Sequence, residues 1–179
     1  MADLPTLAEL EAGGRRRGLL LRLRVGRPAG LAWSLRVAVA RSGDGNSGDG
    51  NPGAPLLLLG ELKGWALPTP AGLRLDTMRV QAQGCRDVGP LIWAATFAWA
   101  LEATPCRRAR LLAIRDDDAQ HRRLVRYFRR LGFEPLKELG GGAGDLAPRL
   151  LWGGAGLLME GDCREGLRRS SLTLGSELW

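Results

Sequence analysis

Two acidic side chains stand alone within strand-like stretches of this sequence, where each could act as a general base. Glu61 interrupts the apolar run at residues 56–67, and Asp76 lies within residues 73–80. A carboxylate held beside a substrate can remove a proton from it during a reaction. Carboxylates on strands are more often solvated partners of arginines. Both interpretations stay open for Glu61 and for Asp76.

The cysteines and the single histidine offer little other chemistry. Cys85, Cys106 and Cys163 lie far apart, without a Cys-x-x-Cys pair. This spacing predicts neither an ordinary zinc site nor a disulfide framework, so we expect no metal and a reducing, cytoplasmic location. Cys85 is a candidate nucleophile, but no histidine lies near it in sequence to activate it.

Length and composition favour one globular domain. The chain has 179 residues, of which 45% are hydrophobic, and this is enough to bury a core. The longest uncharged apolar stretch, residues 88–101, is too short to span a bilayer and predicts a buried helix. The opening residues carry no apolar run, so we expect no signal peptide and no membrane span.

The net charge of +7 comes almost wholly from arginine. Such a balance can indicate a polyanionic partner, but it can also reflect the base composition of the gene. No motif that interleaves aromatic and basic residues is present, so nucleic acid is not the partner we expect. A nucleic-acid interface would require arginines at residues 15–17 and 122–130 to form one patch.

The apolar pattern places the candidate residues on a sheet that is interrupted by two helices. Helices are predicted at residues 91–103, after Pro90, and from Asp116–Asp118 to Gly132. A short helix or a loose arm is predicted at 5–12, a flexible loop at 42–53 and a loose C-terminal tail at 161–179. Strands are predicted at 18–25, 32–40, 56–67, 73–80, 108–115, 133–139 and 150–159. This order is typical of an α+β or mixed α/β domain.

The strand at residues 73–80 changes phase within its own length. Leu73, Leu75 and Thr77 share one face, and then Met78 and Val80 follow in the alternate phase. An extra residue that re-aims the following side chains would produce this change, so the pattern predicts a β-bulge.

Residues 73–133, about one third of the chain, resemble the conserved half of the GNAT superfamily of N-acetyltransferases. The resemblance lies in the bulged strand ending Met78-Arg79-Val80, the polar loop with Gly84 and Gly89, the short strand at 111–114, and the string Tyr127-Phe128-Arg129-Arg130-Leu131-Gly132-Phe133. That string is similar to the family's Tyr-x-x-Leu-Gly-Phe signature. The family's fold is a mixed, mostly antiparallel central sheet flanked by helices.

The resemblance implies that acetyl-CoA, as co-substrate, lies against the bulged strand. Its pyrophosphate would bind the following loop, whose N–H groups face an anion at a helix N-terminus. The family's loop motif can be aligned in two registers, one from Gly84 to Gly89 with Asp87 at a glycine position and one that starts at Gln81 with Arg86 at the position of a small residue. His121 falls where the family often has an asparagine that contacts CoA, or it is a solvated helix-surface histidine. The implied cofactor-binding residues are Met78, Arg79, Val80, Gln81, Gly84, Arg86, Gly89 and His121.

The implied reaction is direct attack of an amine on the thioester of acyl-CoA. A carboxylate such as Glu61 or Asp76, or a water, would take the amine proton, and a backbone N–H would hold the oxyanion. Tyr127 would protonate the leaving thiolate, although Phe128 takes the family's acid position when Leu131-Gly132-Phe133 is aligned. The acceptor would be a small-molecule amine or a protein amine.

A catalytically inactive GNAT-fold protein that binds or assembles through a protein partner is the alternative. The connection at residues 26–31 has no room for the pair of helices that grips substrate in the family. An open cleft beside the backbone of Met78 and Val80 would favour the enzyme. A cleft filled by Trp93 or Arg86 would favour the assembly factor.

Overall fold

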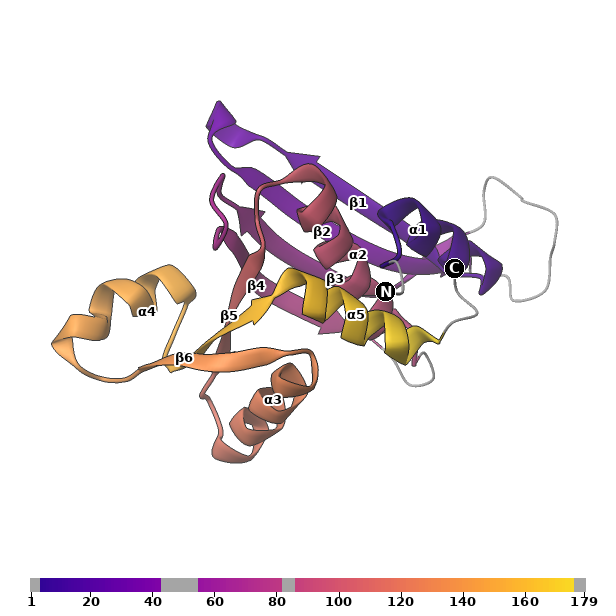
Figure 1. Cartoon of the computed structure of the whole chain (residues 1–179). Coiled ribbons are helices and arrows are strands. Elements are labelled where there is room, and N and C mark those ends of the chain that lie inside the picture. Colours follow the sequence, from indigo (N-terminus) through magenta and orange to yellow (C-terminus); the bar gives the residue numbers. More distant parts are fainter. Residues whose placement is uncertain (1–3, 43–54, 82–85, 176–179) are drawn as a thin grey trace.

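The computed structural model describes residues 4–42, 55–81 and 86–175, and its strands form one sheet in the order β1-β2-β3-β4-β5-β7-β6 (Figure 1). Neighbouring strands are antiparallel, except that β4 and β5 are parallel. This is the mixed, mostly antiparallel sheet flanked by helices that was expected. The strands are β1 (Leu20–Gly26), β2 (Trp33–Ser42), β3 (Leu56–Ala66), β4 (Leu73–Val80), β5 (Arg108–Ile114), β6 (Phe133–Leu139) and β7 (Gly156–Asp162).

Three of the helices lie side by side over one face of the sheet (Figure 1). α2 is the middle one, with α1 along one side and α5 along the other, and it covers β2, β3 and β4. α3 packs at the other end of the sheet, against β5 and β6. The helices are α1 (Leu7–Arg16), α2 (Val88–Ala103), α3 (Asp118–Arg130), α4 (Leu146–Trp152) and α5 (Cys163–Leu174), with short 3-10 turns at Pro28–Gly30 and Ala143–Asp145.

α2 is the buried helix that its apolar sequence predicts. Trp93 and Phe97 are 1% and 0% exposed, and their rings stack with centroids 5.8 Å apart. A glycine in the sheet lets the helix lie close: a Cβ on Gly60 of β3 would come within 2.9 Å of Ile92 Cδ1. Close packing of this kind makes the helix a fixed wall for anything built beside it.

The prediction of a loose tail at residues 161–179 is wrong for most of that segment. Asp162 caps α5 by accepting a hydrogen bond from the N–H of Glu165, and Leu167 and Leu174 are buried. The sequence of α5 is mostly polar, and its few apolar residues do not by themselves predict a helix. The helix is stabilised because these residues pack against α2. Residues 176–179 lie outside the described residues.

One further expectation is corrected near the C-terminal strands, and one alternative is decided at the N-terminus. Residues 146–152 form α4, which Gly153 ends with a φ of +80°, so the last strand begins at Gly156 rather than at residue 150. The segment predicted at 5–12 is a helix that extends to Arg16, begun by a capping box between Thr6 and Glu9. The flexible loop predicted at 42–53 lies outside the described residues, apart from Ser42, which ends β2.

α3 begins and ends as its sequence predicts, and α5 fixes its C-terminal end. Asp117 accepts the N–H of Gln120 at the start, and Gly132 follows the last turn with a φ of +97°. The guanidinium of Arg169 donates to the carbonyl oxygens of Arg129 and Arg130 at 3.1 and 3.3 Å. A cation at this position satisfies carbonyls that the helix itself leaves unpaired.

We expect Glu165→Gln to remove part of the protein's acid sensitivity. Hydrogen bonds from Arg168 and Arg169 lower the pKa of Glu165 from 4.5 to about 2. A carboxyl whose pKa is depressed by folding stabilises the protein above its unfolded pKa, and this contribution is lost as the pH falls from about 4.5 to about 2. In urea unfolding across that range, the free energy of unfolding of the variant should fall less steeply than that of the wild type. At neutral pH the variant should lose about 1 kcal/mol or less, because the pair is partly solvated. Parallel curves for the two proteins would contradict the assignment.

Within the described residues, no helix combines the length and the apolar character needed to cross a membrane.

Candidate active site

The parallel strands β4 and β5 separate soon after they meet, and this opens a gap in the sheet. They pair only between Leu73–Leu75 and Ala109–Leu111. On its other side β4 shifts register against β3, because Lys63 faces Thr77 while Gly64 faces Leu75. Asp76 is therefore the extra residue of a β-bulge. A bulge in this strand was predicted, but it comes before Thr77 rather than after it, so Thr77 lies opposite Lys63 and not on the face of Leu73 and Leu75.

The backbone of β4 beyond the bulge faces this gap at every second residue. The N–H of Gln81 donates to the carbonyl of Leu59 on β3 at 2.7 Å. Antiparallel strands exchange hydrogen bonds at alternate residues, so Arg79 also bonds towards β3. Met78 and Val80 then turn their N–H and C=O groups towards the side from which β5 has diverged.

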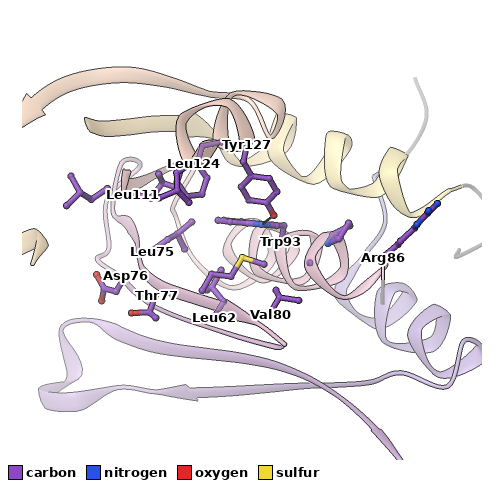
Figure 2. Close-up of a pocket in the computed structure, with 15 residues that line it drawn as sticks. Leu62, Leu75, Asp76, Thr77, Val80, Arg86, Trp93, Leu111, Leu124 and Tyr127 are labelled. Atoms are coloured by element: carbon purple, nitrogen blue, oxygen red, sulfur yellow. Dashed lines mark hydrogen bonds between the residues drawn. The ribbon is translucent and has the colours of Figure 1, made fainter. Parts of the chain in front are cut away.

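A cleft of about 610 Å³ occupies the gap (Figure 2). β4 and β5 form its sides, with α2 and α3 above them. Trp93 and Arg86 line this space rather than fill it, which is the arrangement expected of a ligand site. The lining residues are Leu62, Leu75, Asp76, Thr77, Met78, Val80, Arg86, Gly89, Pro90, Trp93, Leu111, Leu112, Leu124, Tyr127 and Phe128.

Tyr127 extends from α3 into the cleft and meets Trp93 of α2 (Figure 2). The indole Nε1–H of Trp93 donates to the Tyr127 oxygen at 2.7 Å. Because an indole only donates, the phenolic proton of Tyr127 remains available for a ligand. Burial raises the pKa of Tyr127 above its ordinary value of 10.0. The hydroxyl therefore stays protonated at neutral pH and can donate a hydrogen bond into the cleft.

Both Tyr127 and Phe128 line the cleft, so the one-residue offset in the signature does not exclude the tyrosine. Phe128 packs edge-on against Trp93 and Phe133, with ring centroids 6.2 and 6.1 Å apart. Tyr127 is 39% exposed overall, although its hydroxyl lies inside the cleft. Phe128 thus anchors α3 to the core, and its neighbour Tyr127 points into the cleft.

The N-terminus of α2 opens onto the same cleft. Arg86 and Gly89 both line it, and the first hydrogen bond of the helix runs from the N–H of Leu91 to the carbonyl of Asp87. The carboxylate of Asp87 is held at 2.7 Å by Arg17. An anion at this helix end would therefore meet the positive end of the helix dipole and the Arg86 guanidinium, with the neighbouring carboxylate already paired.

Of the two candidate bases, only Asp76 lines the cleft. It accepts a hydrogen bond from Arg74 at 2.7 Å. Glu61 instead accepts from Arg36 at 2.6 Å, and that hydrogen bond lowers the pKa of Glu61. Both carboxylates therefore have the arginine partner that was their alternative role, and Asp76 is the one of the two that also lines the cleft.

Three more predicted contacts lie away from the cleft lining. Arg79 bonds towards β3, with its side chain in the alternate phase to Met78 and Val80. The N–H of Gln81 is used by β3. His121 is 8% exposed, so it is not a solvated histidine, and its Nδ1 donates to the carbonyl of Ile114 at 3.2 Å. Gly84 lies outside the described residues.

From the sequence, Trp93 was considered only as a side chain that could fill the cleft, and its hydrogen bond to Tyr127 was not predicted. A tryptophan on an otherwise apolar helix carries one N–H donor that needs a partner when it is buried. The indole N–H indicated that Trp93 needs a hydrogen-bond acceptor. The acceptor could not be identified from the sequence, because it lies on a different helix, 34 residues further along the chain. The apolar lining from β3, β4, β5 and α3 carries no comparable signal, since it has the ordinary pattern of core-facing residues.

The described cysteines are not placed for nucleophilic catalysis. Cys106 and Cys163 are free and buried, and burial raises the pKa of Cys163 to about 12. A thiol with such a pKa is protonated at neutral pH and is a poor nucleophile. Cys85, the candidate from the sequence, lies outside the described residues. Residues 4–42, 55–81 and 86–175 contain no group of three side chains suited to holding a metal ion.

Comparison of the chain with models of protein families and with curated proteins found no match.

Proposed function

We propose that this protein binds acetyl-CoA in the cleft between β4 and β5 and transfers the acetyl group to an amine. The observation that carries this proposal is the gap itself, where the backbone of Met78 and Val80 faces an open cleft. An extended pantetheine chain carries two amide groups, which can pair with exposed strand backbone as a neighbouring strand would. A cytoplasmic location is part of the proposal, since the buried thiols Cys106 and Cys163 are unpaired, as in a reducing compartment.

The charged end of the co-substrate is assigned to the N-terminus of α2. Its pyrophosphate would accept hydrogen bonds from the N–H groups of Val88 and Gly89 and from the guanidinium of Arg86. Asp87 does not oppose this assignment, because Arg17 neutralises its carboxylate.

In the proposed reaction, the nitrogen of a neutral amine attacks the carbonyl carbon of the thioester. A backbone N–H of the splayed strand holds the oxyanion, and the carbon–sulfur bond then breaks. Asp76 takes the amine proton, directly or through a water, and Tyr127 gives its proton to the leaving thiolate. The products are the N-acetylated amine and free CoA, and the two side chains exchange their protons with solvent.

A second candidate is an assembly factor with this fold but without turnover. The connection between β1 and β2 favours it, because the only helix there is the 3-10 turn Pro28–Gly30. A small acceptor would therefore find no helical cover over that part of the sheet. Acetyl-CoA binding with no transfer to any amine would support this candidate.

A thermal-shift titration with acetyl-CoA, and separately with CoA, tests the binding step. A ligand that binds only the folded state at about a hundred times its Kd adds roughly 2.7 kcal/mol of stability. Gly89→Trp should abolish the shift, because a Cβ at Gly89 would point towards Met78 Cε at 3.7 Å and the Tyr127 oxygen at 3.8 Å. Gly89→Ala is the matched control, since both distances are ordinary contacts, and it should keep most of the shift. A flat wild-type titration at millimolar ligand would contradict the proposal.

A further inference from the structure

The face of the sheet opposite α2 carries charged side chains, and along β2 and β3 no helix of the described residues covers it. On β2, β3 and β4, residues that face α2 are buried, as Val37, Leu62 and Leu73 show at 0% exposure. The alternate residues Arg36, Lys63 and Arg79 are exposed on the other face. In Figure 1 the α1, α2 and α5 helices all lie on one side of these strands. This charged part of the sheet is left for solvent or for a partner.

The outermost layer of this face is positive. Glu61 lies between Arg36 at 2.6 Å and Lys63 at 3.9 Å, and its side chain is only 14% exposed against 50% and 52% for the two cations. Glu160 repeats the arrangement on β7: it is 13% exposed beneath Arg108, which is 61% exposed and lies 2.5 Å away. The less exposed carboxylates therefore pair with cations that lie further out, and a partner on this face would contact the cations before the carboxylates.

The positive face continues into the cleft at the bulge of β4. Asp76 is the extra residue at this point, and Lys63 is paired in register with its neighbour Thr77. A molecule lying across the face could thus place a group at Asp76 while it contacts Lys63 and Arg36. Among the described residues, no helix covers this face along β2 and β3, and α4 covers it only at β4, where the Trp152 ring lies 4.4 Å from the Arg74 guanidinium. The uncovered part suits a polymer better than a small molecule that needs an enclosed pocket.

We propose that the amine acceptor is a lysine or N-terminal amine of an acidic polypeptide, which docks on this sheet face. The inference rests on the proposed acetyl transfer and names its substrate class. The acceptor must present an aliphatic amine at Asp76 and negative charge over the neighbouring strands. A polypeptide with acidic residues beside its amine supplies both, whereas a nucleic acid supplies the charge without an aliphatic amine.

The spacing of the strands sets where the acidic residues should lie. Adjacent strands are about 4.8 Å apart, so Arg36 on β2 is roughly 10 Å from β4, which is about three extended residues. We therefore expect the best acceptors to carry Asp or Glu within about four residues of the acetylated amine.

The test uses three fluorescent peptides of equal length with one lysine each, flanked by Glu, by Gln or by Arg. Binding is measured by fluorescence anisotropy, and acetylation from acetyl-CoA by mass spectrometry. The Glu peptide should bind and react at least tenfold better than the Gln peptide. Raising the salt concentration to 0.5 M should reduce this preference to about a few-fold. The Arg peptide should be the poorest.

Two double charge-reversal variants test whether the preference for the Glu peptide comes from this sheet face. Lys63→Glu with Arg108→Glu should remove the preference for the Glu peptide and leave the acetyl-CoA thermal shift unchanged. Arg123→Glu with Arg164→Glu changes the net charge equally on exposed helix residues, and it should keep the preference. If the reversed pair folds poorly in a thermal melt, Lys63→Gln with Arg108→Gln replaces it, with an intermediate loss expected.

Each outcome separates this inference from the proposed function. Equal acetylation of the Glu and Gln peptides, with acetyl-CoA binding intact, would overturn the acidic acceptor and leave the transferase proposal standing. Binding of the Glu peptide without acetylation would also overturn its assignment as acceptor. Tighter binding of a single-stranded DNA of equal charge, displacing the Glu peptide, would identify the face as a nucleic-acid site instead. A flat acetyl-CoA titration would show that the proposed function itself fails.

Discussion

Replacing Tyr127 with Phe should lower kcat for acetyl transfer by roughly 10²–10⁴-fold, the usual contribution of a positioned acid. The ring would still fill its place beside Trp93, so acetyl-CoA should bind with a similar thermal shift. The variant loses the proton that Tyr127 would give to the leaving thiolate, together with the oxygen that accepts the Trp93 N–H at 2.7 Å. Rates measured by mass spectrometry of an acetylated amine would check the expected loss.

A change of leaving group distinguishes acid catalysis from a structural effect. An acetyl thioester of an aromatic thiol releases a stable thiolate, so breaking its carbon–sulfur bond needs less help from an acid. The ratio of wild-type to variant rates should therefore be much smaller with that thioester than with acetyl-CoA. Trp93→Phe is the matched control, because it removes the donor to Tyr127 and keeps the hydroxyl. An equal loss with both thioesters would mean that Tyr127 only supports the cleft.

Replacing Phe97 with Ala should destabilise the protein by about 3–5 kcal/mol, the usual cost of removing a buried aromatic ring. Phe97 is 0% exposed, stacks on Trp93 and lies 6.3 Å from the ring of Phe133. The loss would also loosen the wall of the cleft that Trp93 forms. Urea unfolding followed by tryptophan fluorescence would measure the change in free energy.

The contact of Phe97 with α5 provides an internal check on this prediction. A Cβ on Gly166 would come within 2.6–2.9 Å of the Phe97 ring. Gly166→Ala should therefore cost about 1–3 kcal/mol through overpacking, although the same change in a solvent-exposed helix is stabilising by about 1 kcal/mol. In the double variant with Phe97→Ala, the void left by the ring would accept the new methyl group. The combined loss of unfolding free energy should therefore be smaller than the sum of the two separate losses. Simple additivity would mean that α5 does not pack on Phe97 in this way.

Local patterns were enough to predict the parts of the site that depend on neighbouring residues. The phase change between Thr77 and Met78 predicts a bulge, which the structure places at Asp76. Pro90 and the preceding loop predict the start of α2, and Gly132 predicts the end of α3. Each depends on interactions within a few residues: an unpaired strand residue, a missing N–H and a left-handed φ of +97°. The mixed fold class follows from the order of these elements, because apolar periodicity distinguishes strands from helices.

Selection among the candidate residues depended on the tertiary structure. Glu61 and Asp76 look alike in sequence, but the bulge places Asp76 at the cleft while Arg36, 25 residues from Glu61, holds Glu61 on the open face. His121 is buried because β5 supplies the carbonyl that its ring needs. Partners this far apart in the chain leave no local periodic signal.

The sequence by itself determined the local segments of this protein: the bulged strand, the apolar helix and the capped ends of α3. Only the tertiary structure decided that Trp93 meets Tyr127, that α5 packs on α2, and that Arg36 and Lys63 are exposed on the sheet face opposite α2. The physical reason is the range of the interactions. Hydrogen bonds within a turn and apolar periodicity act over a few residues, whereas side-chain packing and charge pairing depend on which distant segments the fold brings together.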